Sequence, residues 1–167
     1  METLARRLYM KYTVPFTLAD DYISSKTNNL FKIKVYKNLA YTNALSFVLE
    51  NQMELIKNGH AEPLIFINNI YSVVTAEHND NIVGCSVYNI IPDRLMLWKY
   101  ITVVHPEYRQ QGLAKRFQLV LEEIGRRNGC LRIDSSVHKD NVNMINTNTS
   151  NGMSPEYFRF TKNIGKL

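Results

Sequence analysis

Several features that mark other classes of protein are missing from this 167-residue chain. It has no run of about 18 apolar residues, which a membrane-spanning helix needs, so we expect no membrane partner. Its beginning, M-E-T-L-A-R-R, lacks the apolar core of a secretory signal peptide. Its two cysteines, Cys85 and Cys130, show neither a metal-binding spacing nor a disulfide framework. Together these absences predict a cytoplasmic protein with reduced thiols and no metal site.

Repeats, low-complexity tracts and linkers are also absent, and the length is that of one ordinary domain. Apolar residues, with tyrosine counted, make up 45% of the chain, which is enough to bury a core. We therefore expect a single domain over residues 1–167, with a core at 31–167 and an N-terminal extension at 1–30. Within this extension, the pattern of residues 20–29 is weakly helical.

The charge is unbalanced toward basic residues, with 20 Lys and Arg against 15 Asp and Glu and a net charge of +5. Such a balance suits an anionic ligand or partner. In the N-terminal half, Lys32, Lys34 and Lys37 are interleaved with Phe31 and Tyr36. Basic residues mixed with aromatics can mark an RNA surface, but the same alternation is typical of the exposed face of a strand. We favour the strand, and nucleic acid remains a secondary candidate partner.

The junction H-P-E-Y-R-Q-Q-G-L-A, residues 105–114, is the most informative segment. It follows the apolar run 95–104 and precedes a strongly amphipathic helical pattern. A strand that ends in a turn with Gly112 and the small Ala114 lets the backbone come close to a ligand. The first turn of the following helix then offers unpaired N–H groups to an anion. The junction therefore predicts a phosphate-binding turn.

Two familiar phosphate-binding loops do not match this turn. Neither the P-loop spacing G-x-x-x-x-G-K-S/T nor the dinucleotide spacing G-x-G-x-x-G is present around Gly112. The pattern Arg109-x-x-Gly112-x-Ala114 instead resembles the Q/R-x-x-G-x-G/A signature of the GNAT superfamily of N-acetyltransferases. The preceding V-V-H-P-E-Y is similar to the V-x-P-x-Y that comes before the signature in that family.

A second stretch supports the same resemblance. Residues 140–153, D-N-V-N-M-I-N-T-N-T-S-N-G-M, have the length and register of the closing motif of the family, E-N-x-x-A-x-x-L-Y-x-x-x-G-F. Asn141 falls on the family asparagine, Met144 on the small apolar position, and Gly152-Met153 on Gly-Phe.

The resemblance implies an α/β fold with a central, twisted mixed sheet and helices on both faces. It also implies that the two central parallel strands splay apart after a bulge, with the cofactor arm in the gap. The order of elements agrees with this fold. The expected elements are a strand at 31–36, a helix at 42–57, a hairpin of strands at 71–76 and 82–91, a strand at 95–104, a helix from residue 113 and a strand at 131–137.

The resemblance further implies acetyl-CoA as the co-substrate. The turn would hold its diphosphate, backbone groups at the end of the preceding strand would pair with its pantetheine amides, and Asn141 would hydrogen-bond the arm. The implied cofactor-binding residues are Thr102, Val103, Val104, Arg109, Gln110, Gln111, Gly112, Leu113, Ala114, Lys115 and Asn141.

The departures from the family pattern concern the residues of the chemistry. Where the family most often has a tyrosine that protonates the departing thiolate, this chain has Asn148, whose amide donates a hydrogen bond but delivers no proton. Where two branches of the family place a general-base glutamate, this chain has Ser136 and Trp98. By strand alternation, Asp134 shares a face with Ser136. The predicted catalytic positions are Asn148, Asp134 and Ser136.

Three explanations remain open, in this order. The first is an enzyme that works mainly by positioning an amine against a thioester, with the backbone N–H of Val104 stabilising the oxyanion. A thiolate leaves with little help, because a thiol has a pKa of only about 8.5. The second is a rerouted proton relay, and the third is a degenerate member that binds acyl-CoA without turnover. The relay candidates are Asp134, His105, His138, Tyr100 and Tyr157.

The expected acceptor is a primary amine. A protein lysine or N-terminus is favoured, because the sequence shows no sign of the acidic pocket that a polyamine would need. The positive charge keeps an aminoacyl-tRNA or other RNA-linked amine as the alternative within the enzyme class. The competing class is an acyl-CoA-binding interaction protein without catalysis. The expected assembly is a monomer or a homodimer.

Overall fold

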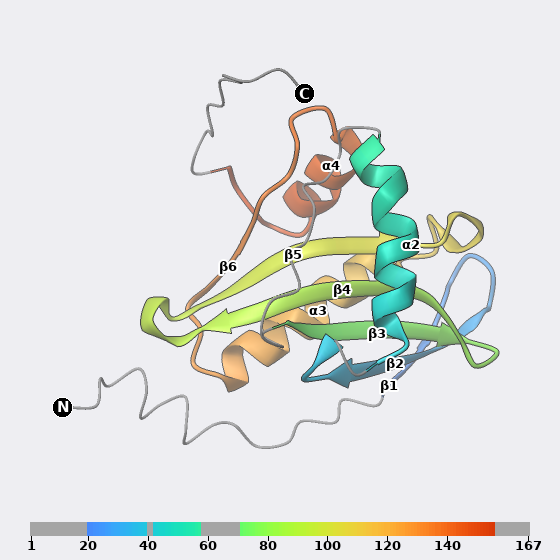
Figure 1. Cartoon of the computed structure of the whole chain (residues 1–167), viewed down its shortest axis with the longest axis horizontal. Coiled ribbons are helices and arrows are strands. Elements are labelled where there is room, and N and C mark those ends of the chain that lie inside the picture. Colours follow the sequence, from blue (N-terminus) through green and yellow to red (C-terminus); the bar gives the residue numbers. More distant parts are fainter. Residues whose placement is uncertain (1–19, 40–41, 58–70, 156–167) are drawn as a thin grey trace.

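The computed structural model describes residues 20–39, 42–57 and 71–155, and a six-stranded sheet forms its centre (Figure 1). The strands lie side by side in sequence order, antiparallel from β1 to β5, and β6 runs parallel to β5. The strands are β1 Asp20–Ile23, β2 Leu30–Tyr36, β3 Ser72–His78, β4 Asn81–Ile91, β5 Met96–Val104 and β6 Arg132–Ser135. The helices are α2 Ala44–Lys57, α3 Leu113–Arg127 and α4 Val142–Ser150, with short 3-10 turns η2 Pro92–Arg94 and η3 Pro106–Tyr108. The predicted mixed α/β architecture is confirmed.

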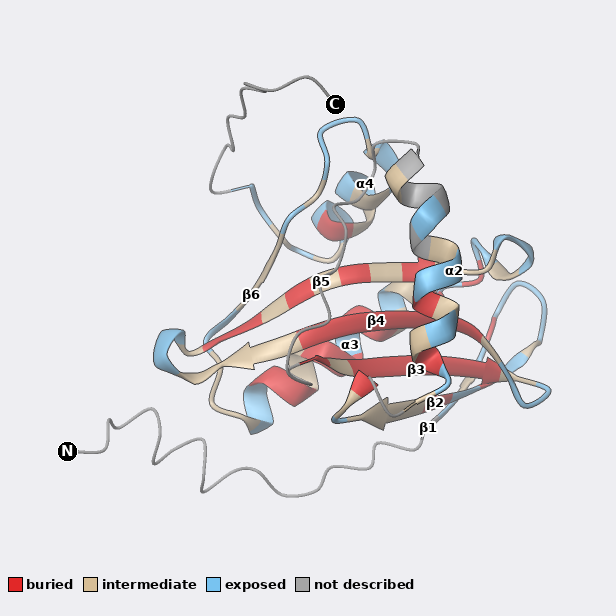
Figure 2. Ribbon diagram, in the orientation of Figure 1, coloured by how far each residue is buried: buried red, intermediate tan, exposed pale blue. Residues whose placement is uncertain are grey.

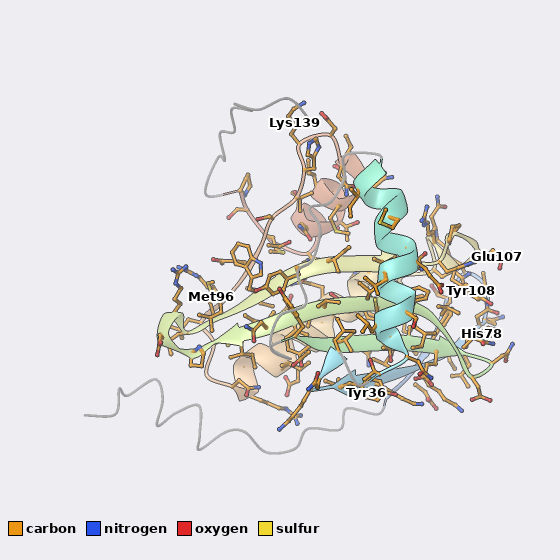
Figure 3. The ribbon with its side chains drawn as sticks, in the orientation of Figure 1. Tyr36, His78, Met96, Glu107, Tyr108 and Lys139 are labelled. Carbon is orange, nitrogen blue, oxygen red and sulfur yellow. The ribbon has the colours of Figure 1, made fainter. Side chains whose placement is uncertain are left out.

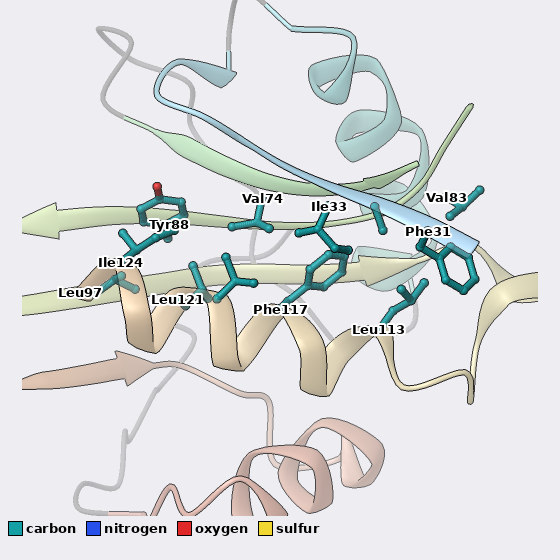
Figure 4. Packing of buried hydrophobic residues seen from close by; sticks show 12 residues of the cluster. Phe31, Ile33, Val74, Val83, Tyr88, Leu97, Leu113, Phe117, Leu121 and Ile124 are labelled. Carbon is teal, nitrogen blue, oxygen red and sulfur yellow. The ribbon is translucent and has the colours of Figure 1, made fainter. Parts of the chain in front are cut away.

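One helix covers each face of the sheet, α2 on one side and α3 on the other (Figure 1). The predicted apolar stripe of α3 is buried in full and packs on the sheet beside Ile33 and Leu97 (Figure 4). On the opposite face, Val48 of α2 packs with Val73 and Val87. Burial is concentrated along β3, β4 and parts of β5, between the two helices (Figure 2). Among the helices of the described ranges, none has the length and apolar character needed to cross a bilayer.

The predicted hairpin of the third and fourth strands is confirmed, and its tight turn has a local cause. Asn79 and Asp80 both have positive φ angles, 49° and 61°. A two-residue turn of this kind matches the right-handed twist of the flanking strands, and Asn and Asp tolerate the left-handed conformation that it requires. The hairpin thereby places β3 and β4 in the middle of the sheet.

The predicted weakly helical stretch at 20–29 is wrong, because its first part forms strand β1. This strand pairs antiparallel with β2, from Asp20 opposite Ile33 to Ile23 opposite Leu30. The Tyr22 ring stacks on Phe31 with their centroids 6.1 Å apart. These contacts come from elsewhere in the fold and override a weak local helical preference.

The two central parallel strands separate after a short paired segment. Strand β5 pairs with β6 only from Met96 to Lys99, opposite Arg132 to Ser135. Directly after Lys99, the register between β4 and β5 shifts by one residue: Tyr88 lies opposite Lys99, but Val87 lies opposite Ile101. Tyr100 is therefore the extra residue of a β-bulge. The implied splay after a bulge is confirmed, although β6 is shorter than the predicted strand at 131–137.

We expect Phe117→Ala to destabilise the fold by about 3 to 5 kcal/mol, because it opens a cavity in the centre of the core. The Phe117 side chain is 1% exposed and packs against Gly84 of β4. The matched control is Leu119→Ala on the same helix, whose side chain is 47% exposed and which should change stability by about 0.5 kcal/mol or less. Urea unfolding measures both, and equal effects would contradict the described packing.

Candidate functional site

The turn between β5 and α3 leaves the start of a long helix without a side-chain cap. The N-cap residue is Gly112, and no side chain caps this end of the 15-residue helix α3. The first backbone bond of the helix runs from the Arg116 N–H to the Gly112 carbonyl, at 2.9 Å. The N–H groups of Leu113, Ala114 and Lys115 therefore lie outside the helical ladder, at the positive end of the helix dipole. This arrangement can bind an anion through backbone groups alone.

Two requirements make glycine the suitable residue at position 112. Its φ angle of 86° lies in the left-handed region, which costs a residue with a Cβ atom about 1 to 2 kcal/mol. In addition, a Cβ atom built on Gly112 would overlap the hydroxyl group of Tyr22. The backbone of the turn is thus packed directly against the β1 strand.

Gln111 holds this turn in place from within. Its side chain is buried, and its carbonyl oxygen accepts hydrogen bonds from the Thr27 hydroxyl at 2.7 Å and the Asn29 amide at 3.0 Å. Its own amide donates to the Glu107 carbonyl at 3.3 Å. The Tyr22 hydroxyl donates to the Gln111 backbone carbonyl at 2.8 Å. The side chain of Gln111 is therefore occupied in bracing the turn, which leaves only its backbone for a ligand.

Ring contacts fix the other end of the turn, where η3 begins. Tyr108 lies 6.0 Å from Phe31 and 5.5 Å from His78, measured between ring centroids. Tyr108 and His78 lie at one end of the sheet, close to Glu107 (Figure 3). The turn is thus tied to β2 and β3 as well as to its own flanking elements.

Two basic residues of the turn, Arg109 and Lys115, are exposed, as is the neutral Gln110 between them. Arg109 donates from its Nε atom to the Val104 carbonyl, at 3.0 Å. The first turn of α3 contains no acidic residue. The turn therefore presents positive charge and unpaired N–H groups together, which fits an anionic group such as a diphosphate.

The end of β5 exposes one edge of its backbone. The N–H of His105 donates to the Val83 carbonyl of β4 at 2.9 Å. Because backbone groups alternate along a strand, Val103 also faces β4, while Thr102 and Val104 face away from it. The contact from Arg109 to the Val104 carbonyl agrees with this direction. Of the three β5 residues expected to pair with the cofactor arm, Thr102 and Val104 thus have backbone groups that face the open edge, whereas those of Val103 face β4.

Asn141 starts helix α4. Its side-chain oxygen accepts a hydrogen bond from the Met144 N–H at 3.1 Å, which caps the helix. Over residues 20–39, 42–57 and 71–155, its side-chain NH₂ group makes no hydrogen bond and is the part that can donate to a ligand. The predicted role of Asn141 toward a cofactor arm therefore rests on this group.

The predicted relay residues lie on several different elements of the fold. Asp134 lies opposite Trp98 on the paired part of β5 and β6, and its carboxylate, 31% exposed, is 3.3 Å from the Arg132 Nε atom. Ser136 is exposed and follows the end of β6. His138 lies in the loop beyond it, with its Nδ1 atom 3.6 Å from the Asp140 carboxylate. Tyr157 lies outside the described residues.

Two further candidates have contacts of their own. The Nδ1 atom of His105 is 3.9 Å from the Glu107 carboxylate at the start of the turn. Tyr100 packs edge-on against Tyr71, with centroids 4.8 Å apart, and burial raises the pKa of its hydroxyl above the usual value. Within the described ranges, no group of three or more His, Cys, Asp and Glu side chains could hold a metal ion.

Asn148 is buried and has a partner that the sequence analysis missed. The Lys99 ammonium donates hydrogen bonds to the Asn148 side-chain oxygen at 2.8 Å and to the Gln118 side-chain oxygen at 3.0 Å. Lys99 is 5% exposed, and burial lowers the pKa of its amine to about 8, although the nearby Glu122 carboxylate acts in the opposite direction. One signal was available, because Lys99 is the only charged residue in the apolar run 95–104.

Comparisons with known proteins address the fold as a whole. A family model described as "Acetyltransferase (GNAT) family" matches residues 42–152 of this chain. A search of curated protein sequences finds no significant match. Several solved structures have a similar fold at low sequence identity.

Three of these structures illustrate the similarity. An aminoglycoside acetyltransferase, meta-AAC0020 from an uncultured soil metagenomic sample, aligns with a TM-score of 0.64 and 12% identity over 81% of this chain and 97% of that one. The aminoglycoside N-acetyltransferase AAC(6')-Iy in complex with CoA aligns with a TM-score of 0.59 and 15% identity over 78% and 98%. A ribosomal-protein-alanine N-acetyltransferase from Brucella melitensis biovar Abortus 2308 aligns with a TM-score of 0.62 and 12% identity over 80% and 99%.

We expect the stability of the protein to depend on pH through Lys99. Its pKa falls from 10.5 to about 8 on folding, so the unfolded chain binds more protons between these values and the free energy of unfolding rises with pH. Lys99→Met removes this effect. From pH 7 to pH 10.5 the native chain should gain about 3 kcal/mol relative to the variant, as measured by urea unfolding. Parallel pH profiles of the two proteins would show that folding leaves the pKa of the lysine unshifted.

Proposed function

Because the chain belongs to the acetyltransferase (GNAT) family, we propose that it transfers the acetyl group of acetyl-CoA to a primary amine of a protein, either a lysine side chain or an N-terminus. Family membership makes the chain an N-acetyltransferase with acetyl-CoA as its co-substrate. The identity of the acceptor and the roles of individual residues are the parts that we propose.

The uncapped start of α3 is the observation that carries this function. It supports binding of the CoA diphosphate by the N–H groups of Leu113, Ala114 and Lys115, with the charges of Arg109 and Lys115 nearby. An anion at this place meets the positive end of a 15-residue helix.

The open backbone edge of β5 supports a place for the rest of the co-substrate. An extended arm with amide groups can pair with Thr102 and Val104 as an added strand would. Either N–H group can also stabilise the oxyanion that forms when an amine attacks a thioester. Thr102 lies nearer to the point where β5 and β6 part, so it is an alternative to the expected Val104 for that role. Positioning the amine against the thioester then supplies much of the acceleration.

The face of β5 opposite α3 supports an acceptor with a single positive charge. Trp98 and Tyr100 lie on this face with their ring centroids 6.2 Å apart, and aromatic faces attract an ammonium group. Asp134 is the residue of β6 opposite Trp98, and Arg132 already lies beside its carboxylate. A polycation such as a polyamine or an aminoglycoside needs several free carboxylates, so one lysine or one N-terminal amine fits better.

The basic residues of β2 do not favour an RNA-linked acceptor. The Lys34 ammonium pairs with the buried Glu77 carboxylate, at 2.5 Å, and Lys32 lies 3.8 Å from Asp80. A lysine whose charge is balanced locally contributes less to binding of a phosphate backbone. We therefore keep the protein amine ahead of an aminoacyl-tRNA.

Gly112→Ala should weaken binding of acetyl-CoA by about 10-fold or more, which corresponds to 1.4 kcal/mol. The added Cβ atom overlaps the Tyr22 hydroxyl and strains a backbone with φ of 86°, so the N–H groups of the turn move. The matched control is Gly129→Ala at the other end of α3. Gly129 has a φ of 72° and open space around a built Cβ, so this variant introduces similar strain away from the turn. Isothermal titration calorimetry measures both, and equal affinities of the two variants would refute the role of the turn.

A panel of amine acceptors tests the proposed substrate class. We expect acetyl-CoA to release CoA thiol with peptides that carry a lysine or a free N-terminus at rates at least about 10-fold above those with spermidine, an aminoglycoside or aminoacyl-tRNA, because the site presents one ammonium position. Thiol release is followed with a chromogenic thiol reagent, and mass spectrometry identifies the acetylated nitrogen. Faster turnover with any of the three other acceptors would replace the protein amine with that acceptor.

A further inference from the structure

Lys99 is a buried cation whose hydrogen-bond partners are neutral. Its side chain is 5% exposed, and its ammonium donates to two neutral amides, those of Gln118 and Asn148. Burying an ammonium without a carboxylate in contact is costly, so such a group is uncommon unless the site uses it. The expected partner for a merely structural lysine would be a carboxylate, as Glu77 is for Lys34.

The position of Lys99 connects it with the open edge of the sheet. Lys99 is the last residue of β5 that pairs with β6, opposite Ser135, and the bulge at Tyr100 follows at once. Thr102, whose backbone faces the open edge, comes two residues after the bulge residue Tyr100. The Lys99 side chain therefore leaves the sheet at the point where the two strands part.

Among the described residues, two of the three donors of the Lys99 ammonium have strong acceptors. An ammonium has three N–H groups, and the amide oxygens of Gln118 and Asn148 occupy two of them. The third has the Met153 sulfur at 3.9 Å, which is a weak acceptor. Helices α3 and α4 thus hold the ammonium from two sides, and over the described ranges its third donor has only this weak acceptor.

Resting on the proposed function, we propose that Lys99 is a catalytic residue that donates a proton to the sulfur of CoA as the acetyl group leaves. The geometry supports this role because the lysine lies at the fork of β5 and β6 and bonds directly to Asn148. Asn148 stands where the resemblance implies a tyrosine acid, and its amide delivers no proton. The ammonium beside it supplies what the amide lacks.

The transfer forms one C–N bond and breaks one C–S bond. The acceptor amine attacks the thioester carbonyl carbon and forms the new C–N bond. The C–S bond breaks, its electron pair goes to sulfur, and the Lys99 ammonium gives its proton to that sulfur to form the CoA thiol. The nitrogen of the new amide loses its extra proton to water, and water returns a proton to the Lys99 amine.

The electrostatic setting suits a proton donor of this kind. Burial lowers the pKa of Lys99 to about 8, close to the value of about 8.5 for an ordinary thiol, and matched pKa values favour proton transfer. Burial is the larger influence on the pKa of Lys99, and the charge of Glu122 on α3 raises this pKa in opposition to it. From β6, Arg132 and Asp134 pair with each other, and the described residues of α4 carry no charge.

A titration of bound CoA tests the contact without turnover. The ultraviolet absorbance of the CoA thiolate, recorded on the complex as pH is raised, should appear at least about one pH unit lower with the native chain than with Lys99→Met, because a neighbouring cation favours the thiolate. Lys34→Met, which removes another strand lysine, is the control and should match the native chain. Equal thiolate titrations in all three proteins would overturn the proposal while leaving the proposed function intact. Failure of CoA to bind any of them would overturn both.

The pH dependence of turnover gives the second test. The rate of thiol release, divided by the fraction of acceptor in its free-amine form, should fall above about pH 8 for the native chain, because Lys99 must carry its proton. Lys99→Met should be about 100-fold slower at pH 7 and lack this fall. A slower variant whose alkaline fall is unchanged would mean that the lysine is only structural.

Gln118→Glu gives a change in the opposite direction. The new carboxylate replaces an amide oxygen that lies 3.0 Å from the Lys99 ammonium, so it should raise the pKa of the lysine. The alkaline fall of the rate should then move to higher pH by about one unit or more, without loss of the fold. An unmoved alkaline fall in this variant would overturn the proposal.

Discussion

The bulge at Tyr100 is the constraint on which the rest of the structure depends, because it decides which backbone groups of β5 lose a strand partner. Up to Lys99, β5 pairs with β4 on one edge and with β6 on the other. The extra residue shifts the alternation of backbone groups along β5, and β6 ends at Ser135. Thr102 and Val104 therefore face an edge that no described strand covers, where Arg109 bonds the Val104 carbonyl and the Val104 N–H remains available. An edge of this kind accepts any extended chain with amide groups. The pantetheine arm of acetyl-CoA is a ligand of that chemistry.

The turn proposed to bind the diphosphate is held from a different part of the chain. Gln111 accepts hydrogen bonds from Thr27 and Asn29 in the loop between β1 and β2, and Tyr22 of β1 bonds its carbonyl. Tyr22, Thr27 and Asn29 precede the range 42–152 that matches the family model. The hairpin of β1 and β2 is therefore part of the scaffold of the turn, and the geometry of the N–H groups depends on residues outside the family signature.

The parts of the site that follow from short-range patterns could be predicted from the sequence. Gly112 and the apolar stripe of α3 lie within 13 residues of one another, and both the uncapped helix start and its buried face follow from them. The parts of the site that the sequence did not predict depend on residues that are far apart along the chain. Tyr22 acts on Gln111 across 89 residues, and Lys99 acts on Asn148 across 49 residues. A weak local preference at 20–29 could not reveal the first pairing, and a single lysine in an apolar run could not reveal its amide partners.

Both hydrogen-bond partners of the Lys99 ammonium, Gln118 and Asn148, are neutral amides. A carboxylate at the place of Gln118 or Asn148 would stabilise the charged lysine and hold its pKa near or above the ordinary value. Such a lysine would keep its proton in the presence of a thiolate and would be a poor acid at neutral pH. Amide oxygens fix the position of the ammonium through hydrogen bonds but add no full negative charge, so burial remains the dominant influence on its pKa. The same two amides therefore hold the lysine at the fork of β5 and β6 and keep its proton transferable.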